Sequence, residues 1–279
     1  MKHQKLTWKT YDGLDIFAQY WEPTVLQPKA VVCLVHGLGE HSSRYAHVAE
    51  AFEREGFVLF TSDLRGHGRS RGPRGHILSI EDFMMDIDVL LEQAGARFAG
   101  LPLFLYGHSL GGIQVLHYGL LRKPKVKGVI ATGSGLHTAL EKQALKVAVA
   151  KVLGTLMPGV SLASGLDPKS ISRDEKVVRA YINDPLVHDK ISLGFGKIML
   201  GVNHWTLRHA GDFPLPLLLM HGEKDVLAFP SSSIEFAAPL KGNCTLVLWE
   251  GAYHEIHNEP EQVEVFKTMT QWMNDRLRD

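Results

Sequence analysis

Six short apolar runs that alternate with helical patterns constrain the fold of this 279-residue chain more than any other feature. The runs are rich in Val, Ile and Leu and are hardly interrupted by polar residues, as parallel strands covered on both faces require. Alternation of such strands with helices predicts a doubly wound α/β sheet with helices on both faces. The strand runs are 30–37, 57–63, 102–109, 126–135, 216–225 and 244–251, and the helical segments lie near 45–55, 79–98, 110–122, 231–240 and 260–277.

The first 21 residues show a different pattern, in which apolar and polar side chains alternate on either side of Asp12-Gly13. Alternation is typical of strands with one exposed face, and Asp-Gly favours the tight turn of a hairpin. We therefore expect two antiparallel strands at one edge of the sheet.

One long segment interrupts the alternation of strands and helices. After Gly135 about 75 residues precede the next strand run, which is too long for an ordinary connection. Residues 139–162 are apolar on one face and carry lysines on the other, so we expect a helical cap over the carboxyl edge of the sheet. The cap would be an insertion at 136–212 between two core segments, 1–135 and 213–279. An extra crossover packed against the side of the sheet is the alternative.

The composition excludes several classes of protein. The chain has 30 Lys+Arg and 30 Asp+Glu, so it lacks the basic excess of a nucleic-acid-binding protein. It has no run of 18 apolar residues that would span a membrane, and its first residues lack the apolar stretch of a signal peptide. Cys33 and Cys244 lie in apolar strand runs, which favours two reduced, buried thiols over a disulfide. We therefore expect a cytoplasmic protein with no nucleic-acid partner, and its oligomeric state is left open.

The strongest chemical motif is Gly107-His108-Ser109-Leu110-Gly111, which follows a strand run and opens a helical segment. A serine hydroxyl becomes an effective nucleophile when a sharp turn lifts it clear of the backbone and a base takes its proton. Gly107 and Gly111 leave room for such a turn. The bare pattern is weak evidence, but its position between a strand and a helix indicates that Ser109 is a catalytic nucleophile.

A nucleophilic serine also needs a base, and a carboxylate that fixes the tautomer of that base. In an open parallel sheet, reacting groups lie in loops just beyond the carboxyl ends of the strands. Asp225 and His254 follow the last two strand runs, and the order Ser, Asp, His is that of a nucleophile-elbow hydrolase. We predict Asp225 as the acid and His254 as the base. The rivals are Asp63, which we expect to order the glycine-rich turn that follows it, Glu223 and His257.

Negative charge that develops on a carbonyl oxygen during the reaction must be met by donors already in place. In this architecture the donors are the backbone N–H after the serine and one from an early strand-to-helix loop. Here these would be the N–H groups of Leu110 and Leu38, with Gly37 and Gly39 setting the path of the early loop.

Several longer motifs run through nearly the whole chain. They are HGLGEHSSRY (36–45), DLRGHGRS (63–70), YGHSLGG (106–112), AYINDPLV (180–187), HGEKDVL (221–227) and EGAYHEIHNE (250–259). On these motifs the chain resembles the α/β-hydrolase superfamily, and within it the monoacylglycerol lipase and lysophospholipase-like group. The resemblance implies the α/β-hydrolase fold, a mostly parallel twisted sheet with an inserted helical cap. It also implies a serine ester hydrolase that cleaves monoacylglycerol to a free fatty acid and glycerol.

The resemblance assigns the triad and the two oxyanion donors to the residues named above, and it adds four positions around the head group. Tyr181 matches a position that meets glycerol, and Glu40, Arg44 and His257 match polar positions at the narrow end of the site. The family often has Ala where Leu38 stands, so the larger side chain is expected to narrow the acyl channel.

The expected chemistry needs neither a metal nor an organic cofactor, because serine, histidine and main-chain groups carry each step. The cap would supply an apolar tunnel, in which each buried methylene is worth about 0.8 kcal/mol. Its lysine-bearing amphipathic face would also allow transient contact with a membrane or micelle surface, so that the protein is peripheral there. A cap that only closes the pocket is the alternative.

Other functions are compatible with the same residues. A lysophospholipase or a broad carboxylesterase would use the same triad, although a lysophospholipid head group calls for cations and Arg44 is the obvious candidate. An aminopeptidase would need acidic cap residues such as Glu175 and Asp184 to hold a free amine. A non-catalytic binding protein on the same fold is disfavoured because all three triad residues are present in order.

Overall fold

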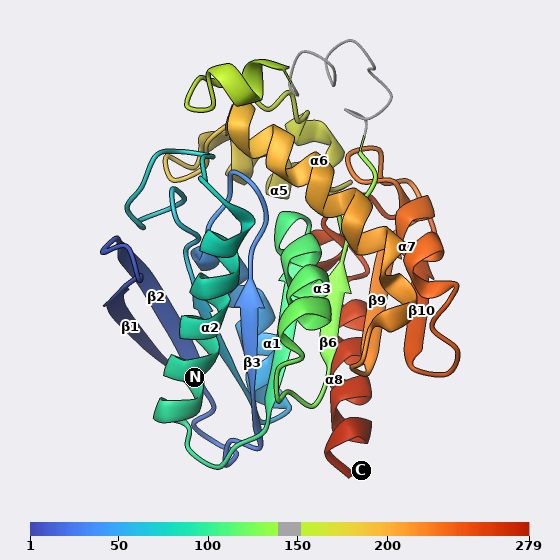
Figure 1. Ribbon diagram of the computed structural model, residues 1–279. Coiled ribbons are helices and arrows are strands. Elements are labelled where there is room, and N and C mark those ends of the chain that lie inside the picture. Colours follow the sequence, from blue (N-terminus) through green and yellow to red (C-terminus); the bar gives the residue numbers. More distant parts are fainter. Residues whose placement is uncertain (139–151, 279) are drawn as a thin grey trace.

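The computed structural model describes residues 1–138 and 152–278, and at its centre lies an eight-stranded sheet (Figure 1). The strand order is β1-β2-β4-β3-β5-β6-β9-β10, in which β1 and β2 form an antiparallel edge hairpin and the strands from β4 to β10 are parallel. Both the parallel sheet and the edge hairpin expected from the sequence are confirmed. The strands are β1 (Lys2–Lys9), β2 (Asp15–Glu22), β3 (Ala30–Val35), β4 (Phe57–Ser62), β5 (Leu103–His108), β6 (Val129–Thr132), β9 (Leu217–Gly222) and β10 (Cys244–Trp249).

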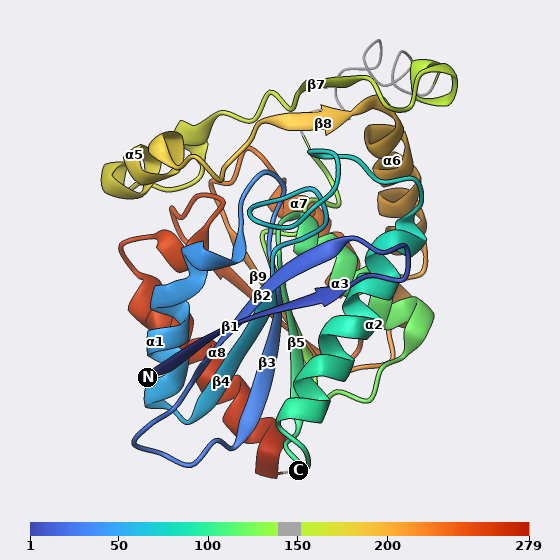
Figure 2. The same ribbon diagram turned by 90° about the vertical axis from the view of Figure 1, so that its left-hand side faces the viewer.

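Helices cover both faces of the sheet, as the unbroken apolar strands require (Figure 2). Successive side chains of β3 point to opposite faces, so that Val31 and Cys33 join the core beneath α2, α3 and α6, whereas Val32 and Leu34 join the core beneath α1 and α8. The helices of the two layers are α1 (Ala46–Arg54), α2 (Ile80–Arg97), α3 (Leu110–Arg122), α7 (Pro230–Ala237) and α8 (Gln262–Arg278). Helix α6 (Leu193–Arg208) comes from the segment above the sheet and packs against α2, α3 and α7.

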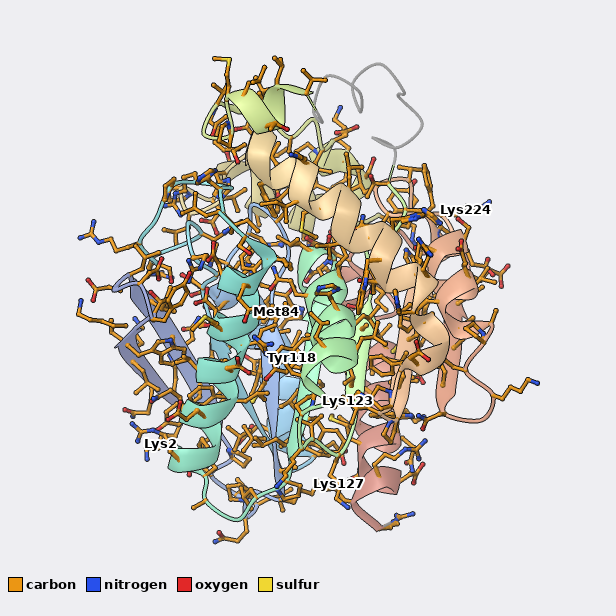
Figure 3. All side chains as sticks on the ribbon, viewed as in Figure 1. Lys2, Met84, Tyr118, Lys123, Lys127 and Lys224 are labelled. Atoms are coloured by element: carbon orange, nitrogen blue, oxygen red, sulfur yellow. The ribbon has the colours of Figure 1, made fainter. Side chains whose placement is uncertain are left out.

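Helix α2 illustrates how local sequence sets an element and its buried face. Its N-cap is Ser79, whose hydroxyl accepts from the N–H of Glu81, while the Asp82 carboxylate accepts from the N–H of Ser79. Met84 on α2 and Tyr118 on α3 are both buried in the same core, whereas lysines project from the periphery of the molecule (Figure 3). The helix thus presents an apolar face to α3 and the sheet.

Several strands end earlier than the apolar runs predict. Strand β6 covers Val129–Thr132 of the predicted run 126–135, and β9 ends at Gly222, before Asp225. Residues beyond these strands, such as Ser134 and Asp225, are nevertheless buried. Burial therefore continues past the last ladder hydrogen bonds into the loops at the carboxyl edge, which is why an apolar pattern overestimates strand length there.

The predicted cap is 136–212, and most of its described part, residues 152–212, lies over the carboxyl ends of the strands (Figures 1 and 2). The helix expected over 139–162 is wrong for its last residues, because the described helical turns end at Leu156 and Pro158 cannot continue them. Residues 139–151 lie outside the described part. The further elements of this segment are β7 (Ser161–Ala163), α5 (Glu175–Asn183) and β8 (Lys190–Ser192), and β7 pairs with β8 antiparallel.

Short 3₁₀ turns occur both inside and outside this segment. They are η1 (Ser42–Tyr45), η2 (Pro168–Ser170), η3 (Ala210–Asp212) and η4 (Ile256–Asn258).

The chain around β8 is bound to loops of the sheet by main-chain hydrogen bonds. The N–H of His188 donates to the carbonyl of Gly39 and the N–H of Ser192 donates to the carbonyl of Gly75, both at 2.8 Å. Gly39 has a φ of +78°, and a Cβ there would overlap the His188 carbonyl. The glycine therefore permits both the turn and the close approach of the upper segment.

The two cysteines are unpaired, as predicted, but they differ in burial. Cys33 lies inside β3 and is fully buried, whereas Cys244 begins the edge strand β10 and is half-buried. The expectation of a buried Cys244 was wrong because an edge strand has a neighbour on one side only. Among the described residues, no helix has the length and apolarity needed to cross a bilayer.

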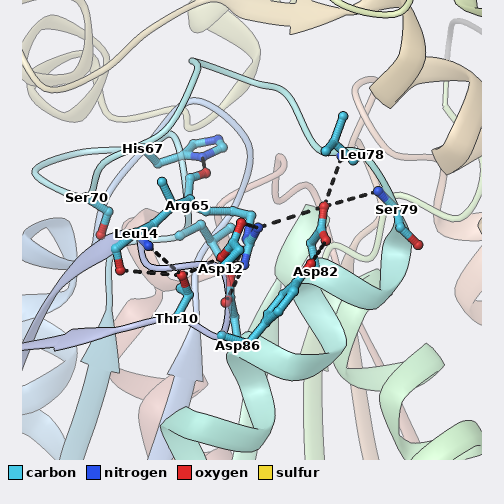
Figure 4. A network of polar contacts seen from close by, with 12 residues as sticks. Thr10, Asp12, Leu14, Arg65, His67, Ser70, Leu78, Ser79, Asp82 and Asp86 are labelled. Atoms are coloured by element: carbon cyan, nitrogen blue, oxygen red, sulfur yellow. Dashed lines mark hydrogen bonds and ion pairs between the residues drawn. The ribbon is translucent and has the colours of Figure 1, made fainter.

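A polar network ties the β1–β2 hairpin to the start of α2 (Figure 4). The Arg65 guanidinium donates to both carboxylate oxygens of Asp86, at 2.7 and 2.8 Å, and to Asp12 in the hairpin turn at 3.2 Å. A third carboxylate, that of Asp82, lies 3.8 Å from it. Because the Arg65 side chain is only 5% exposed, its charge is held by these carboxylates rather than by water.

We expect Arg65→Met to lower the free energy of unfolding by roughly 3 kcal/mol, because it leaves the largely buried carboxylates of Asp82 and Asp86 without their cation. Urea unfolding measures the loss. The control is Arg71→Met, which removes an exposed arginine from the same loop. Equal losses in the two variants would contradict a structural role for the network.

Candidate active site

Ser109 stands on a strained turn between β5 and α3. Its φ of +54° and ψ of −114° fall where a residue with a side chain is rare. The turn is fixed by a hydrogen bond of 2.9 Å from the Ser109 N–H to the carbonyl of Thr132. A Cβ at Gly107 would overlap the carbonyl of Gly111, and one at Gly111 would overlap that of Val35. The two glycines therefore allow the packing that holds the serine in this position.

The structure brings Ser109, His254 and Asp225 into one hydrogen-bonded chain. Nε2 of His254 lies 2.9 Å from Oγ of Ser109, and Nδ1 lies 2.6 Å from Oδ2 of Asp225. Asp225 follows β9 and His254 follows β10, so adjacent parallel strands deliver both groups to the same edge of the sheet. With Nδ1–H donating to the carboxylate, Nε2 is free to accept the serine proton.

The charges at the site favour a basic imidazole. Burial opposes ionisation of Asp225, but interaction with His254 and hydrogen bonds from His221 and His254 keep the pKa of its carboxyl below the usual range. Burial also opposes charge on His254, yet the Asp225 carboxylate raises the pKa of the imidazole above its ordinary value. The histidine is thus prepared to take up a proton from serine.

Leu38 and Leu110 flank the serine and line the cavity in front of it. Within the described residues neither N–H donates a hydrogen bond, so both donors are available to a ligand. The loop that carries Leu38 is ordered by the Glu40 carboxylate, which accepts from the N–H of Gly37 at 2.7 Å and from the hydroxyl of Tyr45 at 2.8 Å. Burial opposes ionisation of Glu40, but the neighbouring Arg44 lowers its pKa to about 2.

The rival residues lie elsewhere. Asp63 accepts from the N–H of Ser42 at 2.8 Å and from the N–H of Arg69 at 2.7 Å, so it orders the glycine-rich turn as expected and the loop before α1. Glu223 is exposed. His257 is buried against the rings of Tyr45 and His108, with centroid distances of 4.9 and 4.6 Å. Within the described residues, none of the three rivals is hydrogen-bonded to Ser109.

Two cavities meet at Ser109 and His254. The larger is mainly apolar and runs beneath the cap segment, and the smaller is more polar. The larger cavity is lined mainly by Leu38, Leu110, Ile113, Leu166, Ile191, Phe195, Gly196, Met199, Leu200, Asn203 and Leu227. The smaller is lined by Gly37, Leu38, Glu40, His108, Leu166, Pro168, Ile171, Tyr181, Leu227 and Glu255. An ester group at Ser109 would therefore have an apolar arm on one side and a polar arm on the other.

The four predicted head-group residues divide into two pairs. Glu40 and Tyr181 line the polar arm, whereas Arg44 and His257 line neither arm. Arg44 donates to both oxygens of Glu255 and to Glu40, each at 2.7 Å, and its guanidinium lies over the Tyr181 ring. Arg44 thus holds the walls of the polar arm together behind the residues that a ligand would touch.

Sequence reasoning missed three parts of the site. His108 lines the polar arm, and burial together with His254 lowers its pKa to about 4. Helix α6 supplies Phe195, Met199 and Asn203 to the apolar arm, and their spacing of four residues was a signal that could have located this face. His221 contacts Asp225 from four residues upstream in the motif HGEKD, but nothing in the spacing alone identified that contact.

The chain is similar to known proteins over most of its length. A family model described as "Serine aminopeptidase, S33" matches residues 26–261. The chain is 35% identical over 267 residues to a monoacylglycerol lipase of Mycolicibacterium smegmatis, a match that covers 95% of each protein. It is 31% identical over 250 residues to phospholipase YtpA of Bacillus subtilis, covering 88% of this chain and 96% of that protein. Among solved structures, the monoacylglycerol lipase of Paleococcus ferrophilus matches with a TM-score of 0.83 at 36% identity, over 99% of this chain and all of that one.

Proposed function

The chain belongs to the serine aminopeptidase S33 family of α/β-hydrolases, and we propose that it hydrolyses monoacylglycerol to a fatty acid and glycerol through an acyl-enzyme on Ser109. Its family and its relatives identify the chain as a carboxylic ester hydrolase, and its fold as the α/β-hydrolase fold expected from the sequence. The observation that carries the proposal is the meeting of one apolar and one polar arm at a serine that is hydrogen-bonded to histidine.

In the proposed reaction His254 takes the Ser109 proton while the serine oxygen attacks the ester carbonyl. The N–H groups of Leu38 and Leu110 hold the resulting oxyanion. Protonated His254 then gives its proton to the leaving glycerol oxygen. Water, activated by the same histidine, attacks the acyl-enzyme and releases the fatty acid, which restores the free serine.

The charges around the polar arm support a neutral head group. Arg44, the cation that a lysophospholipid phosphate would require, is already paired with the carboxylates of Glu40 and Glu255. The acids that an aminopeptidase would require are also engaged or remote. Asp184 is 2.8 Å from His41, and Glu175 is exposed and paired with Arg179.

The test is a comparison of kcat/KM for monooleoylglycerol, dioleoylglycerol, trioleoylglycerol and oleoyl lysophosphatidylcholine in the same detergent, with leucine p-nitroanilide as an aminopeptidase substrate. We expect monooleoylglycerol to exceed every other substrate by at least about tenfold. A lead for the lysophospholipid would favour an activity like that named for the Bacillus relative. Comparable rates on all the esters would indicate a broad esterase.

We further propose that residues 136–212 form a lid, that the lid touches lipid surfaces, and that the protein works in the cytoplasm. The described part of this segment exposes an unusual set of large apolar side chains. They are Val152, Leu156, Met157, Val160, Leu162, Leu166 and Ile182. Exposed apolar residues concentrated on one segment favour contact with a lipid surface.

The double variant Leu156→Ser, Leu162→Ser is expected to lower turnover of emulsified monooleoylglycerol about fivefold or more, because these side chains are 72% and 52% exposed and would enter a lipid surface. Turnover of p-nitrophenyl butyrate, which is dissolved, should change less than twofold. The control is Val25→Ser, which removes an apolar side chain that is 89% exposed on a loop outside the cap. Equal losses on both substrates would count against surface contact.

A further inference from the structure

The carboxylate of Asp225 receives more hydrogen bonds than the triad requires. Oδ1 accepts from the N–H groups of Leu227 and Ala228, at 2.9 and 3.0 Å. Oδ2 lies 2.6 Å from Nδ1 of His254 and 3.1 Å from Nε2 of a second imidazole, that of His221. Asp225 is only 3% exposed although other residues of its loop are exposed, so its carboxylate is held by the chain rather than by water.

The surroundings of His221 fix where its proton lies. Nε2 faces two acceptors, Oδ2 of Asp225 and the carbonyl of Ala228, at 3.1 and 3.0 Å. Neither of these can donate, so Nε2 must carry a hydrogen. Nδ1 lies 2.7 Å from Oγ of Ser233, which can donate to it. His221 is wholly buried, so its Nε2–H donates to these acceptors and not to water.

We propose that His221 is a positioning residue for the catalytic triad, whose Nε2–H holds Oδ2 of Asp225 in line with His254 and limits the basicity of His254. The inference rests on the proposed function and names a residue that the reaction would need in addition to the triad. The proposal depends on one oxygen atom of Asp225, because the same Oδ2 accepts from both imidazoles.

The effect follows from how a carboxylate distributes its charge. Each hydrogen bond donated to a carboxylate stabilises the ionised form and reduces its pull on other donors. With His221 in place, Asp225 stays ionised and attracts the His254 proton less strongly than an otherwise equal carboxylate with one donor fewer. Loss of the His221 donor should therefore raise the pKa of His254 and move the acid limb of kcat/KM to higher pH.

Other ionisable groups lie near His254. Glu40 and Glu255 both raise its pKa. The rings of His108 and His257 are also close, since the centroid of His108 lies 4.9 Å from that of His254 and 4.6 Å from that of His257. Within the described residues, none of these four groups is hydrogen-bonded to His221, so a change at His221 leaves them in place.

Two substitutions separate positioning from packing. The amide of Gln can place its NH2 near the position of Nε2, so His221→Gln keeps a donor to Asp225. The shorter Asn reaches only the position of Nδ1, so His221→Asn keeps the contact with Ser233 and loses the donor. We expect kcat/KM for monooleoylglycerol to fall at least about tenfold in His221→Asn and less than about threefold in His221→Gln.

The pH dependence of kcat/KM separates the two roles, because a packing defect would not shift its acid limb. The acid limb of kcat/KM should shift upward by about half a pH unit or more in His221→Asn, and should stay in place in His221→Gln. An unmoved limb in His221→Asn overturns the proposal whatever the size of the rate loss, and so does an equal shift in both variants.

The wild-type protein offers a test that requires no substitution. Nitrogen-15 histidine spectra should show a hydrogen on Nε2 of His221, and assignment by the His221→Gln variant identifies its signals. The Nδ1–H tautomer would overturn the proposal. Failure of the proposed function is a separate outcome, since it would appear as full activity in Ser109→Ala, whatever happens at His221.

Discussion

Ser109→Ala is expected to lower kcat for monooleoylglycerol by roughly 10⁶-fold, the size of loss seen when the nucleophile of a serine triad is removed. The reason lies in the geometry of the turn, which aims Oγ at Nε2 of His254 at 2.9 Å. No other hydroxyl among the described residues shares that hydrogen bond. Initial rates with a coupled glycerol assay measure the loss, and a fluorophosphonate probe should label the wild type and leave the variant unlabelled.

Ser231→Ala is the matched control, because Ser231 is exposed at the start of α7 and far from the nucleophile in the sequence. It should keep full rate and full labelling. Retained cleavage by Ser109→Ala would refute the acyl-enzyme. A wild-type protein that resists the probe and cleaves no ester would instead indicate a binding protein on a hydrolase fold.

The proximity of the three candidate triad residues could be predicted because, in a parallel sheet, position along the chain determines position in space. The carboxyl ends of β5, β9 and β10 lie at one edge, so Ser109, Asp225 and His254 had to be neighbours once the strands were recognised. Each of these residues follows the end of its strand by no more than five residues, so its position was closely limited. The hairpin at the other edge followed in the same way from local turn chemistry.

The walls of the site were harder to predict because they depend on contacts between distant segments. The cationic side chain of Arg44 is suited to contact a head group. It is instead paired with the carboxylate of Glu255, 211 residues away in the chain. The apolar arm is built by α6 from above the sheet, and no local pattern states where an inserted segment will pack. Long-range packing therefore decided the roles of these residues.

The prediction of helical structure up to residue 162 failed for a different reason. The pattern of apolar residues in 139–162 is helical throughout, and periodicity alone gave no stop before Leu162. Pro158 breaks the helix, and the residues after it pair with β8 instead. A proline inside a periodic stretch was the more reliable signal.

Asp225→Asn is expected to lower kcat by roughly 10⁴-fold, since it reverses the tautomer of the base. Oδ1 of Asp225 accepts two backbone N–H groups, so the amide oxygen of Asn should take that place and its NH2 the place of Oδ2. The NH2 would then face Nδ1 of His254, which can satisfy it only as an acceptor. The hydrogen of the imidazole moves to Nε2, where it blocks acceptance of the Ser109 proton.

The pH profile of the residual activity checks this account. The Asp225 carboxylate raises the pKa of His254, so its loss should move the acid limb of kcat/KM to lower pH. That direction is opposite to the one expected for His221→Asn, which leaves the carboxylate but removes one of its donors. The control is Asp212→Asn, at an exposed carboxylate before β9, which should change neither rate nor limb. An Asp225→Asn limb at higher pH than that of the wild type would be incompatible with a carboxylate that stabilises the protonated base.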